Sequence, residues 1–276
     1  MRSMTQTARS PLSGLETAFG AFWLGMRRNL ANWPVLMGRA LFFCVVMAVV
    51  SALWNKVGAQ RLPGTLATAL PAGGLALYVG VTEWITLSVA SIHLRLEDDI
   101  RFGLLEPHLL RPKPYLLQKI AEALGDTAAR MIGLGAAGIA MIVVFAPALP
   151  PLEAFAFALV LGLLGAAIGV LLFTLTGLAA FWVRRVLPPY LIMQKSIFLL
   201  GGLFAPIWLY PAWFYHAGVV TPFAANIFFP ANQMLQPSAQ TFAEGLFAQV
   251  AWVVILSALI ALVWRAGLRK VLREGL

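Results

Sequence analysis

Residues 154–182 read AFAFALVLGLLGAAIGVLLFTLTGLAAFW, a run of 29 residues without a single charged side chain. About 20 apolar residues are enough for a helix to cross the hydrocarbon core of a bilayer. The run therefore predicts one transmembrane helix that is long enough to tilt in the membrane.

The rest of the chain repeats this pattern on both sides of that run. Hydrophobic residues make up 61% of the 276 residues and charged residues only 11%, whereas a soluble domain carries about 25% charged residues. We therefore expect an all-α integral membrane protein with one membrane domain over residues 1–276. The six predicted spans cover residues 36–54, 72–92, 131–149, 154–182, 191–209 and 246–264.

The basic residues decide the predicted orientation. With the N-terminus inside, 18 of the 20 Lys and Arg residues fall on the inner side, and only Lys56 and Arg61 fall outside. The positive-inside rule then places both termini in the cytoplasm. Because the cations lie in short clusters between apolar runs, the net charge of +9 indicates lipid headgroups as partners rather than nucleic acid.

The segment before the first span has the pattern of an amphipathic helix. Its apolar residues recur at steps of three and four, and Arg27 and Arg28 follow near the end of the stripe. The stripe consists of Leu15, Phe19, Phe22, Trp23, Met26 and Leu30. We expect a helix over residues 13–32 in the cytoplasmic interface, with packing against the bundle as the alternative.

The charged region 95–130, between spans two and three, alternates apolar and charged side chains. A purely solvated connector has no need of this many apolar residues. We expect a short amphipathic helix near residues 97–105, followed by a proline-braced turn, which presents a docking surface in the cytoplasm. The alternative is an interfacial helix packed on its own bundle.

The region 206–245 is apolar but broken by proline. It contains PIWLYPAWFY at 206–215, TPF at 221–223 and FFP at 228–230. Irregular backbone at membrane depth requires burial in protein or a cavity. We therefore expect short re-entrant helices on the external side, and an aromatic belt at the outer interface is the alternative.

Glu83 is the one carboxylate placed centrally in a predicted span, and Thr82, Thr86 and Ser88 are its candidate hydrogen-bond partners. A role in transport and a structural hydrogen bond are both open for it. The glycines Gly162, Gly165 and Gly169 form a small-residue stripe that favours close helix packing.

The sequence lacks the motifs of several enzyme classes. None of its lysines follows a glycine, so the chain has no P-loop. His93, His108 and His216 lack the spacing of metal ligands, and no catalytic constellation is visible. We expect no enzymatic activity, no bound metal and no cofactor on this chain.

Three stretches resemble the permease subunits of ABC-2 type transporters, in particular a bacterial six-span group of that family. The first joins Ile100–Gly103 to Leu109–Pro112, with Glu106–His108 as a departure between them. The second holds Pro206, Pro211, Trp213, Thr221–Phe223 and Pro230, and the third runs from Gln249 and Trp252 through Arg265–Arg269 to Gly275.

The resemblance implies a coupling helix between spans two and three and re-entrant helices between spans five and six. It implies a pair of permease chains, identical or homologous, in a bacterial cytoplasmic (inner) membrane. Two copies of a separate cytoplasmic ABC ATPase would bind ATP and magnesium, and the complex would export hydrophobic or amphipathic compounds.

On this basis we expect five residues to couple the chain to its ATPase. Ile100, Phe102, Leu105 and Leu109 would fill a groove of the ATPase, and Arg111 would pair with its acidic rim. Candidates for the translocation path are Glu83, Trp208, Trp213 and Phe223. The alternative function is a secondary transporter or channel that uses Glu83 as a proton or ion site.

Overall fold

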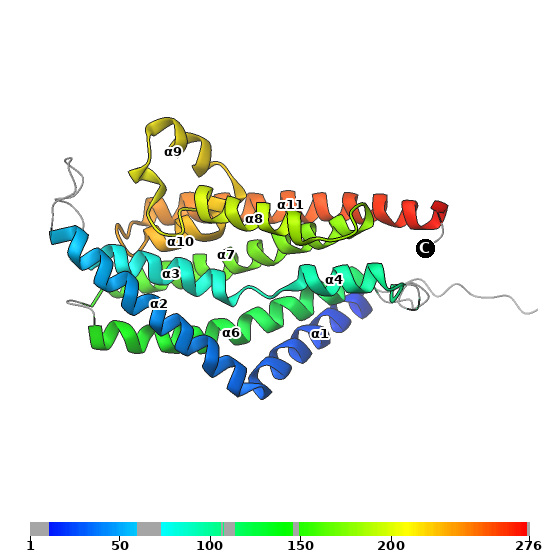
Figure 1. The fold of residues 1–276 in the computed structure, drawn as a ribbon, viewed down its shortest axis with the longest axis horizontal. Helices are drawn as coiled ribbons and strands as arrows, with labels where there is room; N and C mark the ends of the chain where they lie inside the picture. Colours follow the sequence, from blue (N-terminus) through cyan, green and yellow to red (C-terminus); the bar gives the residue numbers. More distant parts are fainter. Residues whose placement is uncertain (1–10, 60–72, 106, 108–113, 146–148, 275–276) are drawn as a thin grey trace, which may run out of the picture.

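The computed structural model describes residues 11–59, 73–105, 107, 114–145 and 149–274, and these residues form helices without a strand. Figure 1 shows an elongated bundle whose long helices run roughly along one axis. We call the end of the bundle that holds α4 the α4 end, and the opposite end, where α9 projects, the α9 end. An all-α membrane protein is thereby confirmed.

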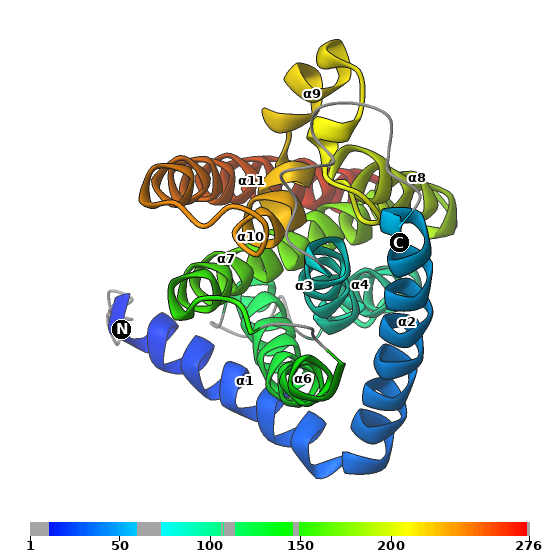
Figure 2. The ribbon, with the colours of Figure 1, turned by 90° about the vertical axis from the view of Figure 1, so that its left-hand side faces the viewer.

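Two helices form the N-terminal part. Helix α1, Pro11–Ala31, corresponds to the helix expected at 13–32, and α2, Trp33–Ala59, contains the first predicted span. The chain turns at Asn32, whose main-chain N–H donates to Arg28 and Asn29, and Pro34 suits the first turn of the new helix. Figure 2 shows α1 and α2 meeting at an angle around α6.

The predicted second span is divided into two helices. Helix α3, Gly74–Ser88, ends at an extended Val89, and α4, Ile92–Arg101, starts three residues later. The hydroxyl of Thr127 accepts the N–H of Ala90 in this break. Helix α6, Tyr115–Phe145, already includes the last part of the region expected to be a connector, so the third span begins well before residue 131.

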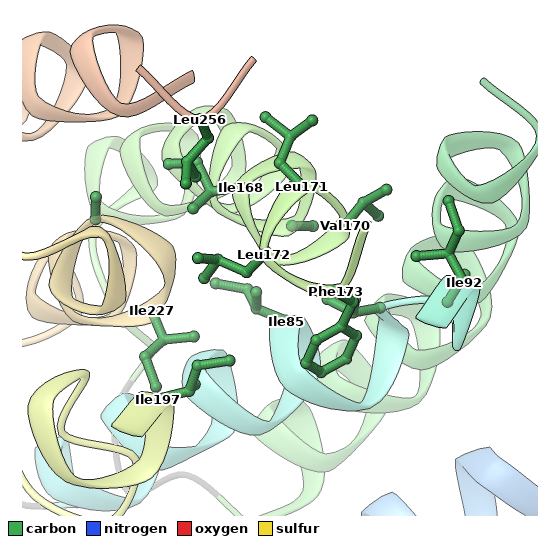
Figure 3. Packing of buried hydrophobic residues seen from close by; sticks show 14 of the residues in the cluster. Ile85, Ile92, Ile168, Val170, Leu171, Leu172, Phe173, Ile197, Ile227 and Leu256 are labelled. Atoms are coloured by element: carbon green, nitrogen blue, oxygen red, sulfur yellow. The ribbon is translucent and has the colours of Figure 1, made fainter. Parts of the chain in front are cut away.

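Helix α7, Leu152–Leu178, followed by the short helix η1, Ala179–Phe181, lies in the middle of the bundle. Other elements pack directly against its glycines. A Cβ at Gly162 would overlap Trp84, one at Gly165 would overlap Asn226, and one at Gly169 would overlap Val89. The stripe predicted from the sequence thus packs helices within this chain. Figure 3 shows side chains of α3, α4, α8, η3 and α11 gathered around α7.

The last third of the chain contains one short helix, a broken segment and one long helix. Helix α8 covers Leu187–Leu200, and the broken segment holds η2, Ile207–Leu209; α9, Ala212–Val219; η3, Ala224–Phe228; and α10, Phe229–Asn232. Helix α11, Ala239–Glu274, starts before and ends after the predicted sixth span.

The predicted fifth span, 191–209, is not one helix. Helix α8 ends at Leu200, and Gly202 follows with a φ of 69°, a left-handed conformation that glycine adopts readily. The hydroxyls of Tyr78 and Thr82 donate to the main-chain oxygens of Gly202 and Leu203 after the helix ends. These hydrogen bonds stabilise a turn where the apolar run alone predicted a continuous helix.

Among the residues that the structure describes, five helical segments are long and apolar enough to cross a membrane. They are Trp33–Leu53, Gly74–Arg101, Tyr115–Val143, Leu152–Phe181 and Ala239–Arg273, the second of which includes both α3 and α4. In Figure 1, α8 and the segment after it lead from the α4 end to the α9 end. The sixth crossing therefore stays a prediction, to be made by a broken segment rather than by one helix.

Candidate functional site

The end of α4 presents an exposed aromatic side chain on a rigid turn. Phe102 follows the last helical residue, and its N–H donates to the main-chain oxygen of Asp98. Gly103, with a φ of 67°, then turns the chain, as glycine commonly does after a helix. Phe102 is 66% exposed, whereas Leu105, three residues later, is buried at 1%. Leu105 therefore anchors the turn in the core, whereas Phe102 faces away from the core.

Helix α4 itself is amphipathic and packs its apolar face on the bundle. Its Ile92, Leu96 and Ile100 are buried, and Leu94 and Asp98 lie on the exposed side. A Cβ at Gly177 of α7 would crowd the main chain of His93 and the side chain of Leu96. The absence of a side chain at Gly177 thus allows α4 to lie directly against α7.

An aromatic cluster fixes the start of α4. The ring of His93 stacks on Tyr190 of α8 with centroids 4.1 Å apart, and it meets Phe173 of α7 edge-on at 5.1 Å. The Nδ1 atom of His93 is buried and has no hydrogen-bond partner among the described residues. Helix α4 is therefore joined at its first turn to both α7 and α8.

Ion pairs join α4 to α6, and the same carboxylates of α6 also bind α1. The guanidinium of Arg95 binds Glu122 at 3.3 Å and also contacts Asp126. Arg28 of α1 binds the same two carboxylates, at 2.6 and 2.7 Å. Partial burial opposes its charge, but Asp126 and Glu122 nevertheless raise the pKa of Arg28. We call Arg28, Arg95, Glu122 and Asp126 the ionic cluster.

Further along, Lys119 of α6 pairs with Asp99 at 2.6 Å, and the hydroxyl of Tyr115 donates to the same carboxylate. Every turn of α4 is thus tied to a neighbouring helix.

Of the residues expected to couple the chain to an ATPase, the structure exposes one and buries two. Phe102 is exposed as a docking side chain requires, but Ile100 and Leu105 are buried in the chain's own core at 2% and 1% exposure. These two cannot fill a partner's groove in this structure, because α4 turns its single apolar face toward the bundle. Leu109 and Arg111 lie outside the described residues.

Sequence reasoning missed the ionic cluster. Its members come from α1, α4 and α6, and Arg28 and Glu122 are 94 positions apart. The available signal was Glu122 and Asp126, two acids one helical turn apart in a chain with only 11 acidic residues. Leu104, exposed beside Phe102, was not among the residues expected to couple the chain to its ATPase.

Glu83 lies on α3 and is 8% exposed, with no hydrogen bond or ion pair among the described residues. Its expected partners bond elsewhere. Thr82 donates to main-chain oxygens including that of Leu203, Thr86 donates to that of Thr82, and Ser88 donates to that of Trp84. The structure therefore does not contain the hydrogen bond from one of these hydroxyls to Glu83 that the sequence suggested as an alternative.

The other candidates for the translocation path lie in the segment near the α9 end. The indole N–H of Trp208 donates to Asn232 of α10 at 3.0 Å, which gives Trp208 a structural role. Trp213 on α9 is 72% exposed, and Phe223 is partly buried against the core. Only Trp213 stands free of the bundle.

A polar network attaches this segment to the long helices. The helix η3 is a π-helix, a form that frequently marks functional sites. Its Asn226 donates to the main-chain oxygen of Gly165 at 2.7 Å, and Gln249 of α11 donates to those of Leu161 and Ala225. The segment is thus fixed to α7 and α11 by buried amides.

A comparison with protein families matches residues 75–275 to the family described as ABC-2 family transporter protein. The chain belongs to the ABC-2 transporter family. The match begins near the start of α3, so α1 and α2 lie before it, and it includes α4, the Phe102 turn and the segment after α8. Among curated proteins, the comparison finds no match.

Membership in the ABC-2 family bears out the resemblance drawn from Ile100–Gly103 and the later stretches. It supports a multi-pass membrane permease of an ABC transporter. Within the matched region, Phe102 is exposed at the end of α4, a helix that is packed and ion-paired on its neighbours.

Proposed function

We propose that this chain is the membrane permease subunit of an ATP-driven exporter and that it couples to a separate cytoplasmic ATPase through the Phe102 turn. The chain would form the translocation path, and the partner would bind ATP and magnesium and hydrolyse the nucleotide. Membership in the ABC-2 family supports the permease role.

The exposed Phe102 on α4 is the observation that carries the coupling proposal. An aromatic side chain that is 66% exposed at the end of a helix packed on the bundle suits a pocket of another protein, because aromatic anchors often dominate binding energy. Leu104 adds a second exposed apolar side chain. Ile100 and Leu105 would support the turn from inside.

The ionic cluster and the stacking of His93 would transmit a movement of the Phe102 turn to the other helices. ATP-driven closure of two ATPase copies would displace the Phe102 turns of two permease chains, identical or homologous. Since α4 is tied to α1, α6, α7 and α8, such a displacement would move these helices together. Movement of packed helices would then open a path at the α9 end.

The proposed orientation places the α4 end in the cytoplasm of a bacterial inner membrane. Arg95, Arg101 and Lys119 lie on α4 and α6 there, and the basic end of α11 lies at the same end of the bundle. Such a concentration of cations favours the cytoplasmic side. The proposed substrates are hydrophobic or amphipathic compounds.

The first test is purification of the tagged chain from its native membrane, followed by mass spectrometry of the chains that accompany it. We expect a P-loop ATPase in stoichiometric amount with the wild type. Phe102→Asp should weaken the association about 30-fold, the effect of losing about 2 kcal/mol at an anchor residue. Insertion and melting temperature should not change, because Phe102 is exposed.

Leu272→Asp provides a matched control. Leu272 is also an exposed apolar residue, near the end of α11, and it receives the same acidic side chain. Retention of the ATPase by Leu272→Asp and its loss by Phe102→Asp would support the docking role. Equal retention by both variants would refute it.

A preparation without any ATPase that still transports solute would refute the whole proposal. In that case transport that is lost in Glu83→Gln would favour the secondary-transport alternative. The observation behind that alternative is a buried carboxylate without a partner among the described residues.

A further inference from the structure

Lys195 is a cation on the exposed side of α8, inside an otherwise apolar run. The stretch Leu191–Leu200 is apolar apart from residues 194–196, which read Gln-Lys-Ser. The side chain of Lys195 is exposed, and Figure 2 shows α8 on the outside of the bundle. The proposed coupling through Phe102 makes no use of this residue.

The first half of α8 lies beside the last part of α7. The ring of Tyr190 meets that of Phe173 edge-on, with ring centroids 5.4 Å apart. From this contact, α8 leads back toward the α9 end, whereas α7 arrives from there (Figure 1). Lys195, five residues after Tyr190, is therefore level with a part of α7 that precedes Phe173.

The end of α8 lies beside η3, because a Cβ at Gly201 would overlap Ile227. Asn226, the preceding residue of η3, donates to the main-chain oxygen of Gly165 in α7. This contact lies further toward the α9 end than the contact of Tyr190. Lys195 lies between the two contacts, so it is level with the middle of α7.

A cation at this level needs a polar environment. The segment Leu152–Phe181, which includes α7, is long and apolar enough to cross a membrane. Lys195 would then lie about 15 Å from either surface of a hydrocarbon core that is ~30 Å thick, too deep for its side chain to reach the headgroups. Ionisable side chains at such depth almost always face a bundle interior or a water-filled cavity. Because Lys195 faces away from its own bundle, we place that cavity outside α8.

The described part of the chain supplies no counter-ion for this cation. The ammonium of Lys195 lies 5.3 Å from the ring centroid of Phe198, an attraction that leaves its positive charge in place, and no described carboxylate pairs with it. Gln194 is partly exposed, and its side-chain amide has no hydrogen bond among the described residues. The polar groups at positions 194 and 195 are therefore available to a partner outside this chain.

Exposed apolar side chains surround Lys195 on the same side of α8. Leu191 and Ile192 lie one turn before it, Leu199 lies one turn after it, and all three are exposed. One cation within an apolar surface matches a compound that has one acidic group and an apolar body.

We propose that Lys195 binds the acidic group of an amphipathic anion in a water-filled translocation path between two permease chains. The ammonium donates a charge-assisted hydrogen bond to the acid, and the apolar body lies along Leu191, Ile192 and Leu199. This inference rests on the proposed permease function and narrows its substrates to amphipathic acids. It does not depend on which residue contacts the ATPase.

Binding of a fluorescent fatty acid to the detergent-purified full chain tests the site. The probes are dansyl-labelled undecanoic acid and its methyl ester at pH 8, which differ in charge. We expect wild type to bind the acid about tenfold more tightly than the ester, which corresponds to about 1.4 kcal/mol. Lys195→Gln should lose this preference, and Lys195→Arg should keep it. Equal affinities of wild type for acid and ester would overturn the site.

Lys56→Gln is the charge-matched control. Lys56 is also exposed, in the last turn of α2, and its loss removes the same formal charge. Loss of the preference for the acid in Lys195→Gln and its retention in Lys56→Gln would support the site. Equal loss in both variants would overturn it in favour of general attraction by net charge.

Cysteine labelling in permeabilised cells tests whether position 195 faces water. In a Cys44→Ser background, Lys195→Cys and Val254→Cys are treated with a water-soluble maleimide. Val254, exposed in the middle of α11 among apolar side chains, is the control for membrane depth. We expect labelling at position 195 only, and protection of that position by the fatty acid. Absence of labelling there would place it in lipid and overturn the proposal.

Failure of this site and failure of the proposed function give different results. Equal binding of acid and ester by a preparation that retains its ATPase would overturn the site and leave the permease role in place. Selective binding of the acid, lost in Lys195→Gln, by a preparation without an ATPase would support the site and refute the coupling to an ATPase.

Discussion

Single polar side chains connect the apolar elements of this bundle, and Gln249 is the clearest case. It projects from α11 and donates to main-chain oxygens of α7 and η3, at 2.8 and 2.9 Å. Asn226 of η3 likewise donates to a main-chain oxygen of α7, that of Gly165. An amide buried in apolar surroundings is favourable only when it is hydrogen-bonded, so Gln249 specifies how α11, α7 and η3 meet, and Asn226 specifies how η3 meets α7.

Gln249→Leu should therefore destabilise the protein while preserving its size. It removes both hydrogen bonds, and we expect a loss of about 1–2 kcal/mol, the scale measured for polar contacts between helices in membranes. Thermal unfolding in detergent, followed by tryptophan fluorescence, measures the change. Gln240→Leu serves as control, because Gln240 is exposed and its side-chain amide donates to Glu244, whereas its main-chain N–H, which the variant keeps, donates to Ser238. Equal melting temperatures for the two variants would contradict this role.

At the scale of elements, α1 and α6 cross with their backbones in contact. A Cβ at Gly25 would overlap the main-chain oxygen of Glu122, and a Cβ at Gly125 would overlap that of Phe22. This close approach allows Arg28 to reach Glu122 and Asp126. The N-terminal helix is thus a packed part of the bundle on one face, and its exposed Phe19 and Trp23 remain on the other.

Gly125→Val should separate the two helices. The added side chain has no room at the crossing, and overpacking of this kind costs about 1–3 kcal/mol. Gly20→Val on α1 is the matched control, since no atom lies within 4 Å of a Cβ at that position. Limited proteolysis near residue 31 should be faster in Gly125→Val only. Identical proteolysis patterns would show that the crossing does not hold α1.

Asp126→Asn should weaken the connection between α1, α4 and α6. Asp126 is fully buried and serves both Arg28 and Arg95, so its neutralisation leaves two cations short of a partner. We expect a loss of about 3 kcal/mol, the lower end of the range for breaking a buried pair, because Arg28 is half exposed. The melting temperature in detergent measures it.

A double-mutant cycle checks the assignment to charge. Asp126→Asn combined with Arg95→Gln should cost less than the two single variants added together, since the second change removes one of the stranded cations. Additive losses would mean that Asp126 and Arg95 do not act as a pair.

At the scale of the whole molecule, the sequence predicted most of the architecture but not the contacts that complete it. Runs such as 154–182 and the stripe from Leu15 to Leu30 were sufficient to locate helices. They could not predict the turn after Leu200, because it depends on hydroxyls of α3 that lie more than 120 positions earlier. The ionic cluster and the burial of Ile100 depend in the same way on distant partners.

Both ends of the described chain lie toward the α4 end, the arrangement that the predicted even number of crossings would produce. Five segments of the described chain qualify as spans by length and composition, and we predict that the segment from α8 to α9 supplies a sixth. Helix α8 has 14 residues and extends only about 21 Å, less than the ~30 Å core of a bilayer. The turn and η2 therefore have to complete the crossing.

Cysteine labelling in intact bacterial cells tests this topology. In a Cys44→Ser background, single cysteines replace Lys56, Leu104, Trp213 and Leu272, one at a time. A membrane-impermeant maleimide should label positions 56 and 213 from outside, and positions 104 and 272 only after permeabilisation. If the segment from α8 to α9 does not cross, position 213 would instead behave like position 104. The pair of positions 56 and 213 thus decides the sixth crossing, and positions 104 and 272 decide whether the Phe102 turn and the end of α11 share the cytoplasmic side.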